Sequence, residues 1–222
     1  MIIVIDKKSI FGNLNLKPLF KVMKNSIKVI IGFCVLCGSA MAQDNAETAF
    51  SKSYSFEYDT QYAKAMEALL ALKSDSYEVN FRLGWLEYLS KDYINSEKYY
   101  KKAIELEPGS IEARFGQVLP LAALGNMNNV LTIYFDILKQ DPNNSIANYR
   151  IAYIYYSKKD YTNAFTYVSK VIKSYPFDFD SNLLAGKIML DSGKKPEAKK
   201  YFLKALEYNP QSEDAKNALK KV

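Results

Sequence analysis

Apolar side chains recur along this chain at helical spacing, and the pattern itself repeats at a fixed interval between residues 77 and 212. Within each repeat, small or apolar residues follow one another at intervals of four and then three, as in Ser96, Tyr100 and Ala103. This spacing gives a helix one buried face. A proline closes every repeat, and these prolines are equally spaced, namely Pro108, Pro142, Pro176 and Pro210. A fixed period of the length from Pro108 to Pro142 predicts stacked copies of one helical hairpin.

Each repeat also carries a turn signal between its two amphipathic stretches. The signals are Lys91-Asp92, Gly125-Asn126, Lys159-Asp160 and Gly193-Lys194. Proline suits the end of a unit because it stops one helix without interrupting the next. The sequence therefore predicts an all-α fold with four units of helix, turn and helix, at 77–110, 111–144, 145–178 and 179–212.

These features resemble the tetratricopeptide repeat (TPR) family. The unit 77–110 carries the family's residues at the expected offsets, namely Leu83, Gly84, Tyr93, Tyr100, Ala103 and Pro108. The resemblance implies a right-handed solenoid of stacked antiparallel helix pairs. Residues 43–76 are expected to form a degenerate first TPR-like unit that no proline closes.

The stretch after the fourth unit is predicted to be a helix that covers the end of the stack and exposes polar residues to solvent. Ser212 is expected to cap its start, and Glu213 and Asp214 suit the positive end of a helix. Residues 213–222 are therefore expected to form a C-terminal cap helix, with Ala215 and Ala218 turned inward and lysines outward.

An export signal is expected ahead of the repeats. Residues 23–42 begin with lysines, continue as a short apolar run and end in Ala40-Met41-Ala42, which is the anatomy of a secretory signal peptide. The apolar run is too short to span a membrane, so no stable span is expected after cleavage, although an uncleaved anchor stays open. Met23 is then the expected start, and residues 1–22 are expected to be an upstream extension outside the natural protein. The product is expected to be exported to a bacterial periplasm, envelope or exterior.

Cleavage after Ala42 would change what the composition means. The whole chain has 30 basic and 24 acidic residues, whereas residues 43–222 keep 24 and 23. The basic character therefore belongs mostly to the signal, and both cysteines leave with it. Because the remaining lysines are interleaved with acidic residues, they suit solvated helix faces, and no nucleic-acid partner is expected.

The residue inventory argues against catalysis. The chain has no histidine, and the cleaved form would have no cysteine, which removes the commonest general base, thiol nucleophile and zinc ligands. Asp178, Asp180 and Asn182 alternate like the start of a calcium loop, but Leu183 stands where that loop needs glycine. We therefore expect no enzyme, no metal site and no cofactor.

The family resemblance points instead to a binding groove. In TPR proteins the first helix of each unit lines a concave surface. Carried onto this chain, the expected ligand-binding residues are Phe81, Trp85, Tyr88, Phe115, Leu119, Tyr149, Tyr153, Tyr156 and Lys187. Aromatic side chains of this kind give large, rigid contact areas at interfaces. The alternative is that they pack between neighbouring helices or are covered by the N-terminal segment.

The function expected from these observations is a non-catalytic scaffold or adaptor of the bacterial cell envelope. It would hold a peptide or helix of a protein partner in an aromatic concave groove. Two alternatives stay open: a carbohydrate-binding envelope protein, and a self-associating structural module that forms a homo-oligomer.

Overall fold

The computed structural model describes residues 45–222, and the chain divides after Lys73 into two compact units. In the first unit, residues 45–58 are helical and α2 spans Tyr62–Leu70. Among residues 45–73, the buried ones are Ala49, Ser53, Ala65 and Leu69. The predicted upstream extension and signal peptide, residues 1–42, lie outside the described residues.

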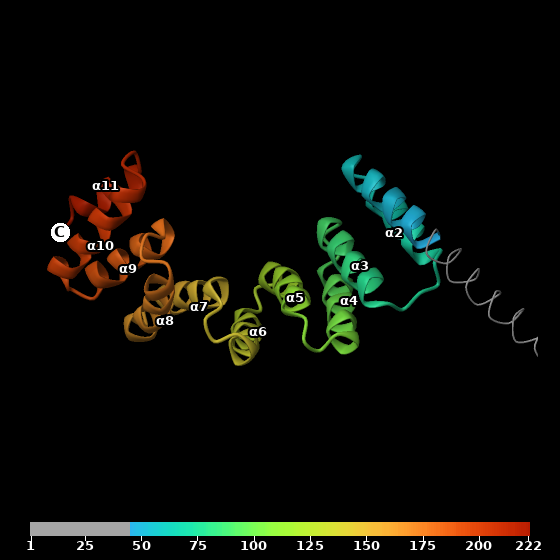
Figure 1. Cartoon of the computed structure of the whole chain (residues 1–222), viewed down its shortest axis with the longest axis horizontal. Helices are drawn as coiled ribbons and strands as arrows, with labels where there is room; N and C mark the ends of the chain where they lie inside the picture. Colours follow the sequence, from blue (N-terminus) through green and yellow to red (C-terminus); the bar gives the residue numbers. More distant parts are fainter. Residues whose placement is uncertain (1–44) are drawn as a thin grey trace, which may run out of the picture. The chain divides into compact units, whose positions relative to one another are not determined.

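The second unit, from Ser74 to Val222, is a succession of antiparallel helix pairs that can be followed by colour in Figure 1. Its helices are α3 (Tyr77–Leu89), α4 (Tyr93–Leu106), α5 (Ile111–Ala123), α6 (Met127–Gln140), α7 (Ser145–Ser157), α8 (Tyr161–Ser174), α9 (Phe179–Asp191), α10 (Lys195–Tyr208) and α11 (Glu213–Leu219). Residues 45–222 contain no strand. The predicted all-α class is therefore confirmed.

Short polar residues start nearly every helix of the second unit. At each such start, a serine, aspartate or asparagine side chain accepts a hydrogen bond from the backbone N–H three residues later. The residues are Ser76, Asp92, Ser110, Asn126, Asn144, Asp160, Asp178 and Ser212. This satisfies one of the N–H groups that the first turn of a helix leaves unpaired. In α10, Pro196 stands in the first turn instead, where a missing N–H costs nothing.

The turn inside each pair has the same backbone conformation in all four repeats. Lys91, Gly125, Lys159 and Gly193, which occupy equivalent positions of successive repeats, have φ values of 67°, 74°, 59° and 80°. Helices commonly end with one residue in this left-handed region, and glycine adopts it without strain. The two lysines therefore adopt this conformation at a cost in conformational free energy. All four hairpin turns lie where the sequence predicted them.

A buried side chain on the second helix of a pair joins that pair to the next one. Tyr100 on α4 is 1% exposed, and its ring lies against Gly84 on α3 and Gly116 on α5. A Cβ atom at Gly84 would lie 3.0 Å from the ring, and one at Gly116 only 2.2 Å. The ring thus fixes how closely α3 and α5 approach. Phe202 on α10 lies against Gly186 in the same way, 2.4 Å from where a Cβ would be.

Two buried asparagines tie the proline turns to the helices that follow. The side-chain amide of Asn148 donates to the carbonyl of Pro142 at 3.1 Å and to that of Asn144 at 2.9 Å. Asn182 repeats this arrangement with Pro176 and Asp178, at 3.1 and 2.7 Å. An amide can donate twice, so one side chain satisfies two carbonyls at the junction. A polar residue is therefore useful at a position where the repeat family commonly has an apolar one.

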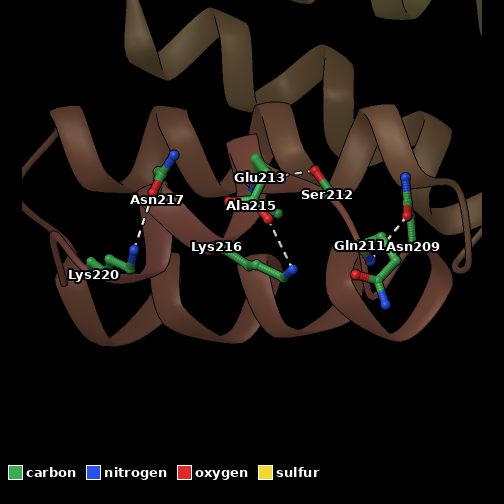
Figure 2. Close-up of polar contacts among 8 residues, drawn as sticks. All are labelled: Asn209, Gln211, Ser212, Glu213, Ala215, Lys216, Asn217 and Lys220. Carbon is green, nitrogen blue, oxygen red and sulfur yellow. Dashed lines mark hydrogen bonds and ion pairs between the residues drawn. The ribbon is translucent and has the colours of Figure 1, made fainter.

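The C-terminal helix α11 has the start and the buried face that were predicted for a cap helix. The Ser212 hydroxyl accepts from the Ala215 N–H at 3.2 Å, and Lys216 forms an ion pair with Glu213 (Figure 2). Ala215 and Ala218 are buried against α10 residues, including Phe202. The predicted capping serine and the inward alanines are confirmed.

The contact between Tyr100 and Gly116 makes a testable prediction. Gly116→Ala should lower the free energy of unfolding by about 1–2 kcal/mol. The added methyl overpacks a ring held on both sides, which outweighs alanine's better helix propensity. Urea denaturation followed by circular dichroism measures the change.

Gly109→Ala is the matched control, because no atom lies within 4 Å of its added Cβ. It should change stability by less than about 0.5 kcal/mol. Placing Gly116→Ala in a Tyr100→Leu background should reduce its cost. An equal cost in both backgrounds would show that the ring is not the cause.

Candidate functional site

A groove of about 400 Å³ lies among α7, α9 and α11. These helices occupy equivalent places along the repeating pattern, each following one of the proline turns. The lining residues are Tyr149, Tyr153, Tyr156, Asp180, Leu183, Leu184, Lys187, Leu190, Asp191, Asp214, Asn217, Ala218 and Lys221. A hollow of this volume is in the range of pockets that bind small ligands, and it accommodates a few side chains of a larger partner.

Three tyrosines of α7 form one wall. Tyr149, Tyr153 and Tyr156 are spaced by four and then three residues, so they share one face of the helix. Tyr153 is 51% exposed, whereas Tyr149 and Tyr156 are half-buried. The wall therefore offers an apolar surface with phenol groups at its edge, which suits a contact that must be both apolar and hydrogen-bonded.

Acidic and basic groups stand at different levels of the groove. Asp180 and Asp214 lie in the first turns of α9 and α11, where the helix dipole favours negative charge. Lys187 and Lys221 follow them by seven residues, which in α9 is about 10.5 Å along the helix, whereas Lys221 lies two residues beyond the end of α11. Because Lys187 lies in the interior of α9, capping and the dipole do not account for it.

Two of the tyrosines are electrostatically coupled to α9. The Tyr156 hydroxyl donates a hydrogen bond of 2.7 Å to Oδ2 of Asp191. Burial raises the pKa of Tyr156 well above its ordinary value, and the bond to Asp191 adds to this. Burial also raises the pKa of Tyr149, with the Asp180 carboxylate contributing. The Tyr156 hydroxyl thus already donates its proton to Asp191, which joins α7 to α9 at this wall.

The structure brings four of the nine predicted site residues into this groove: Tyr149, Tyr153, Tyr156 and Lys187. Leu183 and Leu190, which continue the same stripes on α9, line it as well.

The other five predicted residues lie half-buried on α3 and α5: Phe81, Trp85, Tyr88, Phe115 and Leu119. Most of their rings contact other rings. Phe81 lies beside Tyr77 and Tyr100, with centroids 5.8 and 5.5 Å away. Trp85 stacks on Tyr88, which also contacts Tyr93, and Phe115 contacts Tyr134. Their role in binding stays a prediction.

Four groove residues on α11 and just beyond it were not predicted as site residues: Asp214, Asn217, Ala218 and Lys221. Residues 213–222 were expected only to cap the stack. The period of the repeat could have indicated them, because Asp180, Leu183, Leu184 and Lys187 each lie one full repeat before one of the four. Figure 2 shows one of them, Asn217, whose side-chain oxygen accepts a bond from Lys220 at 3.3 Å.

Within residues 45–222, no three acidic, histidine or cysteine side chains are grouped so that they could hold a metal ion. Asp178, the first residue of the calcium-like pattern, caps α9 by accepting from the Ser181 N–H at 2.8 Å. Asn182 is engaged with backbone carbonyls. The helices of this part of the chain also include none that is long and apolar enough to cross a membrane.

Comparison with family models identifies the repeat. One model described as a tetratricopeptide repeat matches residues 77–110 and 179–212, and a second with the same description matches residues 134–179. Among curated proteins, a DnaJ homolog subfamily C member 3 from Gallus gallus is 33% identical over 98 residues. The match covers 44% of this chain but only 19% of that relative.

Solved structures share the fold over most of the chain. A tetratricopeptide repeat protein from Parabacteroides merdae superposes with a TM-score of 0.70 at 18% identity, covering 79% of this chain and 71% of that one. MamA from Desulfovibrio magneticus gives 0.65 at 15% identity, with 77% and 98% covered. YrrB, described as a TPR protein with an unusual peptide-binding site, gives 0.63 at 15%, with 79% and 92% covered. The predicted helical solenoid is thereby confirmed.

The hydrogen bond between Tyr156 and Asp191 predicts a pH dependence. At pH 7, Tyr156→Phe should cost about 0.5–1 kcal/mol of unfolding free energy through loss of this bond. The folded-state pKa of Tyr156 is raised, so its contribution is complete below about pH 10, the value for an unfolded tyrosine, and is lost as pH rises through the folded value.

The difference in stability between wild type and Tyr156→Phe should therefore shrink above pH 10. Urea midpoints measured at pH 7, 9 and 11 would test this. A difference that stays constant over the series would mean that ionisation of Tyr156 is not linked to folding.

Proposed function

We propose that this chain, which contains tetratricopeptide repeats, is a non-catalytic scaffold that holds a segment of a protein partner in the groove of α7, α9 and α11. Proteins built from these repeats bind other proteins or peptides, and the described residues supply a hollow of the size that such binding uses. The likeness to YrrB supports a peptide-type ligand, because that structure is described by its peptide-binding site.

The observation that carries the proposal is the exposed tyrosine wall of the groove. Tyr153 is 51% exposed although it lines the groove together with apolar residues such as Leu183 on α9. Large, rigid aromatics in hollows are where binding energy concentrates at protein interfaces. Lys187 occupies the position equivalent to Tyr153 in the next repeat and lines the same groove. Because a charged side chain lines it, the groove is not merely an apolar gap left by imperfect packing.

The place of action that we propose is the bacterial cell envelope, either the periplasm or the outer surface. The support is sequence-based: residues 23–42 have a basic start, a short apolar run and a small-residue cleavage site. A cleaved product without cysteine suits an oxidising compartment.

A capture experiment tests the groove. The full chain would be used as bait in envelope extract, beside Tyr153→Ala and Tyr175→Ala. Tyr175 is 56% exposed but does not line the groove, so it is a control of nearly equal exposure. We expect partners enriched by wild type to persist with Tyr175→Ala and to fall by about 10-fold with Tyr153→Ala.

Equal capture by both variants would place the contact elsewhere on the molecule. If no protein is enriched, and soluble glycans instead perturb the tyrosine signals of the groove, the carbohydrate-binding alternative replaces this one. A doubled mass in light scattering that Tyr153→Ala abolishes would favour self-association.

Export is tested separately. Expression of the full chain in a bacterial host should yield a product in the envelope fraction whose N-terminal residue is Gln43, read by mass spectrometry. Ala40→Arg/Ala42→Arg should block cleavage, because signal peptidase sites need small residues there. Retention of an intact N-terminus in the cytoplasm of cells making the wild-type chain would contradict the proposed location.

A further inference from the structure

The charges of the α7, α9 and α11 groove are ordered along the helices. The acidic level holds Asp180 and Asp214, and the basic level holds Lys187 and Lys221. In α9 the two levels are separated by seven residues, or about 10.5 Å. A third carboxylate, Asp191, lies one turn of α9 beyond Lys187 and accepts the Tyr156 hydroxyl, which leaves its negative charge in place. Between Asp180 and Lys187, a partner therefore meets negative charge at one level and positive charge at the next.

Between these levels the lining is aromatic on α7, apolar on α9 and polar on α11. The residues at this middle position are Tyr149, Leu183 and Asn217, and the half-buried ring of Tyr149 is the largest of their side chains. A complementary ligand thus needs an apolar side chain in the middle, an acidic group at one end and a basic group at the other. Like charges placed at either level would cost binding energy, so this order discriminates between partners.

The separation of the levels favours one backbone conformation. In an α-helix, residues seven apart lie on one face and about 10.5 Å from each other, which is the spacing of the two levels. In an extended strand, residues three apart span about 10 Å but point to opposite faces. A helix therefore presents both charges to the groove at the spacing of the two levels, with apolar residues between them at the third and fourth positions.

The direction of such a helix also follows from electrostatics. An acidic residue is favourable near the N-terminus of a helix and a basic one near its C-terminus. A helix with that order meets Lys187 with its acidic residue and Asp180 with its basic residue only when it lies antiparallel to α9.

We propose that the groove binds an amphipathic α-helix of a protein partner that carries an acidic residue, apolar residues three and four positions later, and a basic residue seven positions later. This rests on the proposed function, since it specifies what the same groove holds. The volume of about 400 Å³ accommodates the side chains of one helix face while the rest of the helix lies outside.

Peptides of defined sequence test the proposal. The probe is an alanine-rich helical peptide containing EAAFLAAK, titrated against the full chain by fluorescence anisotropy in low salt. Two control helices contain EAAFLAAE and KAAFLAAK, which keep the apolar residues and place a like charge at one level. We expect the probe to bind at least about 10-fold more tightly than either control. A proline-rich peptide with the same charged and apolar residues, which cannot form a helix, should also bind more weakly.

A charge-reversed groove supplies the matching protein test. Lys187→Glu/Lys221→Glu should transfer the preference to the KAAFLAAK helix. Lys199→Glu/Lys204→Glu, on exposed positions of α10 outside the groove, makes the same change in net charge and should leave the preference as in wild type. Circular dichroism would show that each variant is folded.

The outcomes separate this proposal from the proposed function. Equal binding of all helices, lost with Tyr153→Ala, would retain the groove and overturn the charge pattern. Equal or tighter binding of the proline-rich peptide would overturn the helical partner. Binding that survives both Tyr153→Ala and Lys187→Glu/Lys221→Glu would overturn the groove itself, and no binding by any helix would overturn the helical ligand.

Discussion

Contact between a buried second-helix ring and the glycines of first helices fixes how closely the helices pack at both ends of residues 74–222. Tyr100 occupies the space left by the missing side chains of Gly84 and Gly116, and Phe202 does the same against Gly186. Each ring is at most 1% exposed and cannot retreat into solvent. In stacked repeats, where every unit contacts only its neighbours, such local contacts replace a single central core. The spacing of α3 and α5 follows from the size of the Tyr100 ring.

The same construction presents different chemistry from one repeat to the next. The position occupied by Trp85 in the first repeat holds Leu119, Tyr153 and Lys187 in the following ones. On α3, the rings near that position contact one another, as Trp85 does with Tyr88, whereas the tyrosines of α7 border a hollow. One series of equivalent positions therefore carries different side chains on the same backbone design, and only on α7 and α9 do these positions border the groove.

Much of the fold could be predicted from the sequence, because the local signals for turns and helix starts recur from one repeat to the next. The hairpin turns at Lys91 and Gly125 and the capping role of Ser212 are decided by neighbouring residues alone. The groove was harder to predict. Whether an aromatic borders a hollow or a neighbouring ring depends on contacts between helices of different repeats, which no local pattern contains. The groove residues Asp214, Asn217 and Lys221 were not predicted, because residues 213–222 were assigned only as a cap and the repeat period was not extended past Pro210.

One wall of the groove is the seven-residue helix α11, which is held chiefly through its alanines against α10. A helix of two turns has little stability of its own, so α11 depends on this contact with α10 to stay folded. Any ligand that touches Asp214 or Lys221 therefore binds only the molecules in which α11 is in place. By thermodynamic linkage, occupancy of the groove would suppress local fraying of α11 and slow the exchange of its amide hydrogens. The rate of amide hydrogen exchange in α11 would then show whether a ligand occupies the groove.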